Sequence, residues 1–209
     1  MRQLDISMPL FAGMPAFPGD PLFRSEKVRA IVRGDAYDIS RLSFGSHAGT
    51  HIDPPVHFVP DGPSLDQIDL EALNGPCQVV GVSESIRTVG DREVGGVSPG
   101  TRRVLFRTAN SERWRRRLEF FSDYVGLDPS AAEALVDRGV RLVGIDSLSV
   151  ERDSTGRFPV HHRLLGAGVL ILEGLLLAEA TPGNYELRCF PLRVREGDGG
   201  PARAVLLAP

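Results

Sequence analysis

Three of the five histidines in this 209-residue chain lie within eleven positions, together with a carboxylate. They fall in the run His47-Ala48-Gly49-Thr50-His51-Ile52-Asp53-Pro54-Pro55-Val56-His57-Phe58. His and Asp side chains are ligands for cations such as zinc, and His also transfers protons near neutral pH. One short segment therefore offers both metal ligands and an acid–base group.

The spacing of these residues constrains the backbone that must hold them. In a straight strand, His47 and His51 would lie roughly 13 Å apart, at about 3.3 Å per residue, which is too far to share an ion. A helix would bring them together, but the proline pair at 54–55 opposes a helix here. Gly49 permits a sharp bend, and the prolines fix the direction in which the chain leaves it. We therefore predict a bent segment that points His47, His51 and Asp53 at one spot.

The alternative interpretation is a solvated loop whose histidines have no function. That interpretation would be preferred for one or two surface histidines. Four potential ligands on a turn shaped by glycine and proline favour a metal site instead.

A second group of ligand-type residues lies in the C-terminal half. His161 and His162 are adjacent, and Glu173 follows His161 by twelve residues, within the apolar stretch from Val169 to Leu177. A buried carboxylate costs several kcal/mol unless it is paired or binds a cation. Glu173 either lies at an exposed strand end or binds a metal, and the first cluster favours the metal. The pooled imidazoles and carboxylates suit one or two Zn²⁺ or Mn²⁺ ions with an open position for water.

Composition and charge narrow the class of protein. A net charge of −3 gives no electrostatic reason to bind nucleic acid. Residues 1–5 lead into a mixed segment without an apolar core, and the stretch 169–177 is too short to span a bilayer. We therefore expect no secretory signal, no membrane partner and a cytoplasmic location. Cys77 and Cys189 have no paired spacing, so we expect two buried thiols rather than a disulfide framework.

The pattern of apolar residues predicts more strands than helices. The helix at 128–139 is the best defined, with Asp128 as N-cap, Pro129 at the first position and Gly139 after the end. Residues 6–20 are expected to form an extended arm. Two further helices are expected at 66–73 and 160–165, and strands at 36–44, 77–82, 103–108, 140–145, 169–172, 186–194 and 202–207. We predict a single α/β domain, residues 1–209, with a mixed, barrel-like β core flanked by helices.

The histidine run resembles the signature of the cyclase family of metal-dependent hydrolases. The resemblance extends over most of the chain. It includes Phe17-Pro18-Gly19-Asp20, Gly144-Ile145-Asp146-Ser147, His161-His162, Ile171-Leu172-Glu173-Gly174, Pro182-Gly183-Asn184-Tyr185-Glu186-Leu187 and Pro201-Ala202-Arg203-Ala204-Val205-Leu206.

The resemblance implies a site with two divalent metal ions, Zn²⁺ or alternatively Mn²⁺. One ion would be bound by His47, His51 and Asp53. His161 would bind the second ion, and Asp53 and Glu173 would be shared between the two. His57 matches the family's acid–base histidine, and His162 is expected to lie outside the ligand set. The resemblance also implies assembly as a homodimer or higher homo-oligomer.

The activity implied by the resemblance is hydrolysis of a small-molecule amide. Bacterial formamidases of the family make N-formylkynurenine the leading substrate, which would yield kynurenine and formate. Phe17 stands where these enzymes usually have a substrate-contacting tryptophan, and Leu148 where they commonly have proline. Another aryl amide, a lactam or a lactone is therefore the alternative substrate. A non-catalytic metal- or ligand-binding protein is the alternative class, but such a protein would not need His57 beside a complete ligand set.

Overall fold

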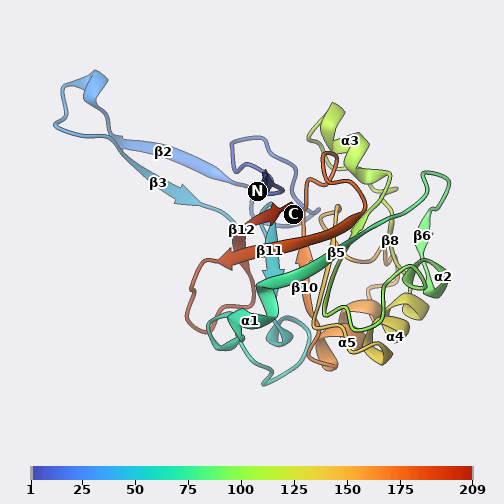
Figure 1. Cartoon of the computed structure of the whole chain (residues 1–209). Coiled ribbons are helices and arrows are strands. Elements are labelled where there is room, and N and C mark those ends of the chain that lie inside the picture. Colours follow the sequence, from blue (N-terminus) through green and yellow to red (C-terminus); the bar gives the residue numbers. More distant parts are fainter. Residues whose placement is uncertain (1, 209) are drawn as a thin grey trace.

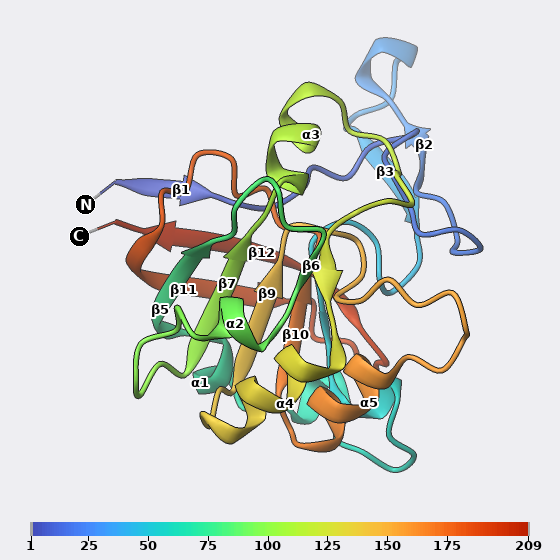
Figure 2. The same ribbon diagram turned by 90° about the vertical axis from the view of Figure 1, so that its right-hand side faces the viewer.

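The computed structural model describes residues 2–208, and its main feature is a sheet that curls until its two ends meet (Figures 1 and 2). Eight strands of the described chain follow the order β1-β12-β11-β5-β7-β9-β10-β4, and β12 also pairs with β4. This pairing closes a seven-stranded barrel, with β1 added at the edge of β12. The strands are β1 (Gln3–Asp5), β4 (His51–Asp53), β5 (Gly75–Gly81), β7 (Arg103–Arg107), β9 (Leu142–Ile145), β10 (Leu170–Glu173), β11 (Gly183–Pro191) and β12 (Gly200–Leu207).

The barrel is mixed. Strands β5, β7, β9 and β10 run parallel to one another, whereas β4, β12 and β11 complete the circle through antiparallel pairs. The closing pair joins Ile52 to Gly200 and His51 to Pro201. The predicted α/β fold with a mixed, barrel-like core is confirmed.

Alternate residues of the parallel strands enter two different cores, because successive side chains of a strand point to opposite faces. In β7, Leu105 packs inside the barrel, whereas Val104 and Phe106 pack outside it. The outer core is covered by α4 (Pro129–Asp137) and α5 (Pro159–Gly166), which lie together beside β9 and β10 in Figure 2. Burial on both faces explains why these strands read as continuous apolar runs.

Short elements complete the chain. As predicted, Asp128 caps α4 by accepting a hydrogen bond from the Ala131 amide, and Pro129 opens the helix. The predicted helix at 66–73 is divided in two, and no helix within residues 2–208 is long and apolar enough to cross a membrane. The remaining elements are η2 (Pro55–His57), η3 (Leu65–Gln67), α1 (Leu70–Leu73), α2 (Asp91–Val94), α3 (Asn110–Arg116) and the strand pair of β6 (Thr88–Val89) with β8 (Gly126–Leu127).

A β-hairpin projects from the body of the molecule (Figure 1). The predicted strand at 36–44 is β3 (Ile39–Ser43), and it pairs with β2 (Arg24–Arg29), which the sequence did not predict. All residues of both strands are exposed, and the short helix η1 (Ile31–Arg33) lies between them. We call residues 22–44 the hairpin arm.

Candidate metal centre

Strands β4 and β10 bring three of the predicted ligands together. In their antiparallel register His51 lies directly opposite Glu173, and Asp53 lies two residues along β4 on the same face. The residue between them, Ile52, points into the barrel core. The ligands therefore lie on the outer face of the barrel, and all three are buried.

The predicted bend before β4 is present and brings His47 back towards this face. Gly49 has a left-handed φ of 65°, and the His47 and His51 ring centroids lie 5.0 Å apart. Nδ1 of His47 lies 2.8 Å from Oδ1 of Asp53. Gly174, after Glu173, also has a positive φ of 67°, and a Cβ there would collide with the Gly49 carbonyl. Glycine at both positions lets the two backbones cross closely.

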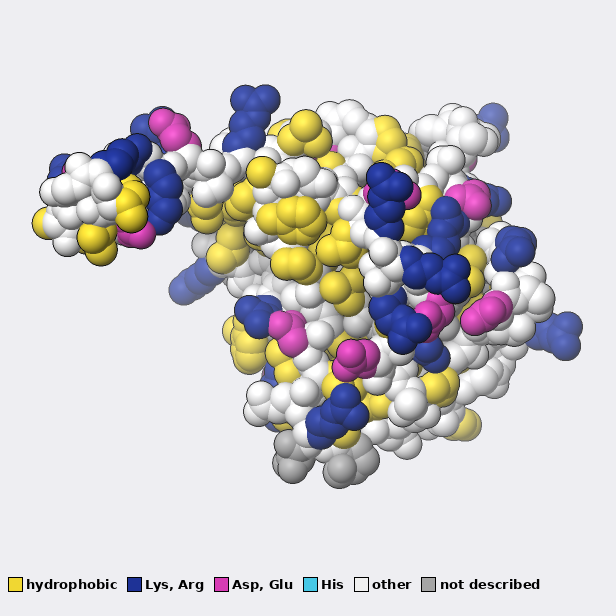
Figure 3. Space-filling view, turned by 90° about the horizontal axis from the view of Figure 1, so that it is seen from above, with side chains coloured by type: hydrophobic (Ala, Val, Ile, Leu, Met, Phe, Trp, Pro, Cys, Tyr) yellow, Lys and Arg dark blue, Asp and Glu magenta, His cyan; other side chains and the backbone are white. Residues whose placement is uncertain are grey.

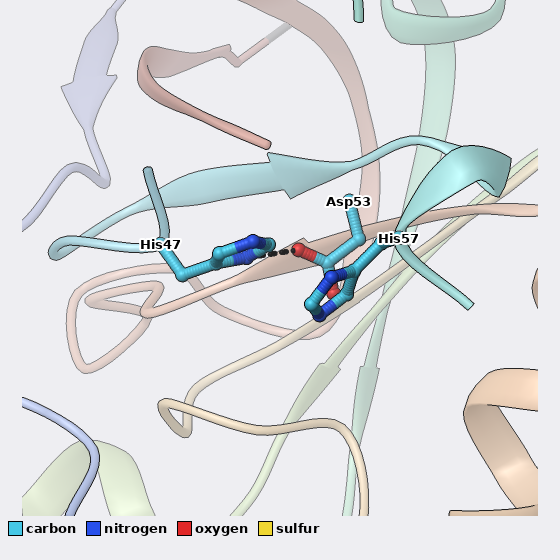
Figure 4. A group of neighbouring side chains, drawn as sticks. All are labelled: His47, Asp53 and His57. Atoms are coloured by element: carbon cyan, nitrogen blue, oxygen red, sulfur yellow. Dashed lines mark hydrogen bonds and ion pairs between the residues drawn. The ribbon is translucent and has the colours of Figure 1, made fainter. Parts of the chain in front are cut away.

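His57 follows the proline pair and turns back onto the same site. Pro55 opens η2, and His57 at its end stacks on His47 with a ring-centroid distance of 4.0 Å. Figure 4 shows His47 and His57 directed at Asp53 from opposite ends of β4. One ligand atom from each of these three residues lies within 4.8 Å of the others. His57 is thus close enough to act on a metal-bound group or to bind the metal itself.

His161 reaches the site from α5. Its Nε2 lies 3.4 Å from Oε1 of Glu173 and 3.9 Å from Oδ2 of Asp53. Its Nδ1 is hydrogen-bonded to Glu151 at 2.6 Å. His162 is exposed, whereas His161 is buried; neither belongs to the two tightest ligand groups of the described chain, which His161 borders through Glu173 and Asp53.

These residues fit a divalent cation. They form two overlapping groups, His47 with Asp53 and His57, and His51 with Asp53 and Glu173, so that Asp53 belongs to both. Among the described residues, Oδ2 of Asp53 and Nε2 of His47 are buried without a hydrogen-bond partner. A buried unpaired carboxylate oxygen is costly unless a cation satisfies it. The imidazole and carboxylate donors suit zinc or manganese.

Without a metal, protons balance the charges of the site. Burial opposes the charged form of His51, but the hydrogen bond to Glu173 and the charge of Asp53 raise its pKa to about 9. Burial likewise opposes charge on His161, whereas hydrogen bonds to Glu151 and Glu173 raise its pKa to about 10. The pKa of Asp53 is lowered, because the His47 hydrogen bond and the charge of His51 outweigh burial, which raises it. A cation would replace these protons.

Two buried carboxylates near the site were not predicted as functional. Glu151 holds His161, and no sequence pattern distinguishes it from other acidic residues. Asp146, from the Gly-Ile-Asp-Ser motif, accepts hydrogen bonds from the amide and hydroxyl groups of Thr108 and Ser111. Asp146 therefore ties the start of α3 to the end of β9 and is not a ligand.

Phe17, the predicted substrate contact, is half-buried and packs edge-on against Phe120, with ring centroids 5.9 Å apart. Phe120 also packs against the apolar cluster that contains Leu148. The two positions that depart from the formamidase pattern are therefore linked through Phe120.

The chain belongs to the cyclase family, whose model matches residues 4–152. Kynurenine formamidase from Delftia acidovorans is 33% identical, over 99% of this chain and 98% of that protein. Kynurenine formamidase from Geobacillus thermodenitrificans is 35% identical, over 97% of this chain and 96% of that protein. These relatives confirm the predicted family and the prediction of an enzyme that hydrolyses amides.

Solved structures show the same fold. A predicted metal-dependent hydrolase from Bacillus stearothermophilus has a TM-score of 0.84 and 30% identity, over 98% of this chain and 97% of that chain. Isatin hydrolase A from Labrenzia aggregata, bound to benzyl benzoate, has a TM-score of 0.83 and 27% identity, over 98% of this chain and 93% of that chain.

Proposed function

We propose that this protein is a metal-dependent arylformamidase that hydrolyses N-formylkynurenine to kynurenine and formate. The observation that carries the proposal is the buried, overlapping pair of ligand groups around Asp53 in a chain related to kynurenine formamidases over nearly its full length. We further propose that residues 1–209 act as one domain, since β1 and β12, from the two ends of the chain, pair in one sheet.

The proposed site holds two divalent cations, Zn²⁺ or Mn²⁺. His47, His51 and Asp53 would hold one ion, His161 the second, and Asp53 and Glu173 would be shared. When bound, such ions polarise a carbonyl and lower the pKa of water to about 7. The position of these residues on the outer face of β4 and β10, opposite His161 of α5, supports this proposal.

His57 is the proposed acid–base residue. Burial lowers its pKa, and the charge of His47 lowers it further, so that its imidazole is neutral near pH 7. A neutral imidazole accepts a proton from the attacking water and then returns it to the leaving amine. Phe17 is the proposed contact for the aryl ring of the substrate.

A lactam is the second candidate substrate. Isatin hydrolase A shares the fold at 27% identity, and isatin is a cyclic aryl amide. Phe17 and Leu148 both depart from the formamidase pattern, and Phe120 links them, since it contacts Phe17 and packs against the apolar cluster that contains Leu148. These departures support a substrate other than N-formylkynurenine.

Turnover of matched substrates tests both candidates. Protein purified without chelators would be reconstituted with Zn²⁺ or Mn²⁺ and assayed against N-formylkynurenine, isatin and an aryl lactone. We expect up to two metal equivalents and the highest kcat/KM with N-formylkynurenine. Preference for isatin would establish the second candidate, and binding without turnover of any substrate would indicate a binding protein. Full metal content and activity in His51→Ala would refute the ligand assignment.

We also propose that the protein is a homodimer formed through the hairpin arm. A two-stranded hairpin is marginally stable alone, and this one stands away from the body with apolar side chains among its charged ones (Figure 3). Val32 is 94% exposed and Ile31 is 63% exposed at the tip. On the body, the exposed apolar residues Leu10, Phe190 and Leu192 line one hollow. A second copy offers both apolar surfaces a partner by exchanging arms.

A further inference from the structure

Glu151 has a buried carboxylate whose contacts all face the start of α5. The residue is 3% exposed. Its Oε1 accepts a hydrogen bond from the His161 amide at 2.9 Å and lies 2.6 Å from the His161 ring Nδ1. Its Oε2 accepts from the Val160 amide at 3.1 Å. Both oxygens are therefore engaged, and Glu151 is not available as a metal ligand.

The backbone beside Glu151 holds the other ligand of the same half of the site. The Val150 amide donates to Oε1 of Glu173 at 2.5 Å. The backbone of Val150 and Glu151 is itself held in place. The Tyr124 hydroxyl donates to the Glu151 carbonyl, and the Leu127 amide donates to the Val150 carbonyl, each at 2.7 Å. Two consecutive residues on a rigid segment thus orient both Glu173 and His161.

The contact at Nδ1 determines which nitrogen of His161 faces the site. A carboxylate accepts hydrogen bonds and does not donate them, so the ring carries its proton on Nδ1. Nε2 faces Glu173 and Asp53, and it is the nitrogen at which a cation would replace a proton. A carboxylate behind a metal-binding histidine fixes the ring and increases its basicity.

We propose that Glu151 is a positioning residue that presents Nε2 of His161 to the second metal ion and strengthens its binding. This inference rests on the proposed two-metal site. The other histidine ligands lack an equivalent support. Nδ1 of His51 contacts the neutral Gly49 carbonyl. Nδ1 of His47 contacts Asp53, which is itself a proposed metal ligand, and its Nε2 lies 3.6 Å from Asp198, whose side chain is 63% exposed. Loss of the Glu151 charge should therefore lower the affinity for the ion that His161 binds and leave the affinity for the other ion unchanged.

Metal titration of Glu151→Gln tests the inference. Zn²⁺ affinities would be measured by competition with a chromogenic chelator, and the geometry of the site by the visible absorption of Co²⁺. We expect the wild-type protein to bind two ions, and Glu151→Gln to bind one normally and the other about 10–100-fold more weakly, with an altered Co²⁺ spectrum. Glu133→Gln is the matched control. Glu133 of α4 pairs with Arg163 of α5, the helix that carries His161, but Glu133 is exposed.

Further measurements distinguish two roles of Glu151, which are to orient the His161 ring and to cap α5. Glu151→Asp keeps the charge and should recover part of the affinity lost in Glu151→Gln. Equal losses in both variants, together with lower thermal stability of the metal-free proteins, would overturn the proposal in favour of helix capping. Wild-type affinity for both ions in Glu151→Gln would also overturn it. A wild-type protein that binds no metal would instead refute the proposed function.

Discussion

Asp53 is the residue on which the site depends most. Its two oxygens face different groups, with Oδ1 2.8 Å from His47 and Oδ2 towards His161. It also belongs to both ligand groups and is fully buried. A single carboxylate in this position couples the two halves of the site, so a change on either side affects both.

Substitution of His57 distinguishes a role in acid–base catalysis from a role in metal binding. General acid–base groups typically contribute 10²–10⁴-fold, so His57→Ala should lower kcat by about that factor while metal content stays nearly intact. Stopped assays with metal analysis of the same sample provide the measurement. His162→Ala is the control, because His162 is exposed, and it should retain activity. Loss of metal in step with activity would make His57 a ligand, as its position near His47 and Asp53 allows.

The paired histidines and carboxylates also predict how stability depends on pH. The pKa values of His51 and His161 rise from 6.5 to about 9 and 10, so their contribution is complete below pH 6.5 and is lost as pH rises through those values. Chelator-treated protein should therefore lose several kcal/mol of stability between pH 6.5 and 10, at about 1.4 kcal/mol for each unit by which the folded and unfolded pKa values differ, and its Tm should fall accordingly. Asp53 and Glu173, whose pKa values are lowered, remain charged throughout this range.

Metal-loaded protein provides the comparison for the pH measurement. A cation competes with protons for the imidazoles and binds more tightly as pH rises. The difference in Tm between loaded and chelated protein should therefore widen from pH 6.5 to 9. A constant difference would mean that these histidines do not change their protonation state when metal binds.

At the scale of elements, some strands and helices can be predicted from the sequence and others cannot. The run Asp128-Pro129 and the apolar strands at 103–107 and 142–145 are predictable, because caps and double-sided burial leave local patterns. Strand β2 is not, since Arg24–Arg29 has a polar sequence and all of its residues are exposed. The opposition of His51 and Glu173 is likewise absent from any local pattern, because it is a register between distant strands.

The histidine bend was predictable from Gly49 and the prolines, whereas the support of His161 by Glu151 was not. Bends leave their signature in neighbouring residues, but a hydrogen bond between a loop residue and a helix residue ten positions later leaves none. The ligand roles of the five residues remain predictions for metal analysis to test.

Helix α3 offers a prediction at the same scale. Asp146 is fully buried and accepts hydrogen bonds from two amides and two hydroxyls at the start of α3. Asp146→Ala would leave these donors unsatisfied and should lower the free energy of unfolding by about 3 kcal/mol. Chemical denaturation measures this loss. Asp123→Ala removes a carboxylate that pairs with Arg113 at the surface and should cost less than about 0.5 kcal/mol. Equal effects would show that Asp146 is not an anchor.

At the scale of the whole molecule, the hairpin arm connects assembly to the site. Strand β3 ends at Ser43, four residues before His47, so the arm and the first ligand belong to one continuous segment. A partner that holds the arm would also restrain the approach to the metal centre. The arm is therefore expected to affect activity as well as oligomeric state.

Substitution at the tip of the arm tests this expectation. The double variant Ile31→Asp with Val32→Asp places charges on two exposed apolar positions, and it should shift the protein from dimer to monomer in analytical ultracentrifugation. Leu70→Asp, at another exposed apolar position, on α1, is the matched control and should remain dimeric. A monomeric wild-type protein would contradict the proposed assembly.

Closure of the barrel has a consequence for the order in which the protein folds. His51 pairs with Glu173 on one side and with Pro201 on the other, so β4, from the first third of the chain, lies between two strands from its C-terminal part. Contacts between such distant residues form late, because closing a long loop costs entropy before any contact repays it. The parallel strands and their helices come from a nearer stretch of chain and have less entropy to lose. During refolding, the ability to bind metal should therefore appear later than the secondary structure. The rate of metal binding would then report the rate at which β4 closes the barrel.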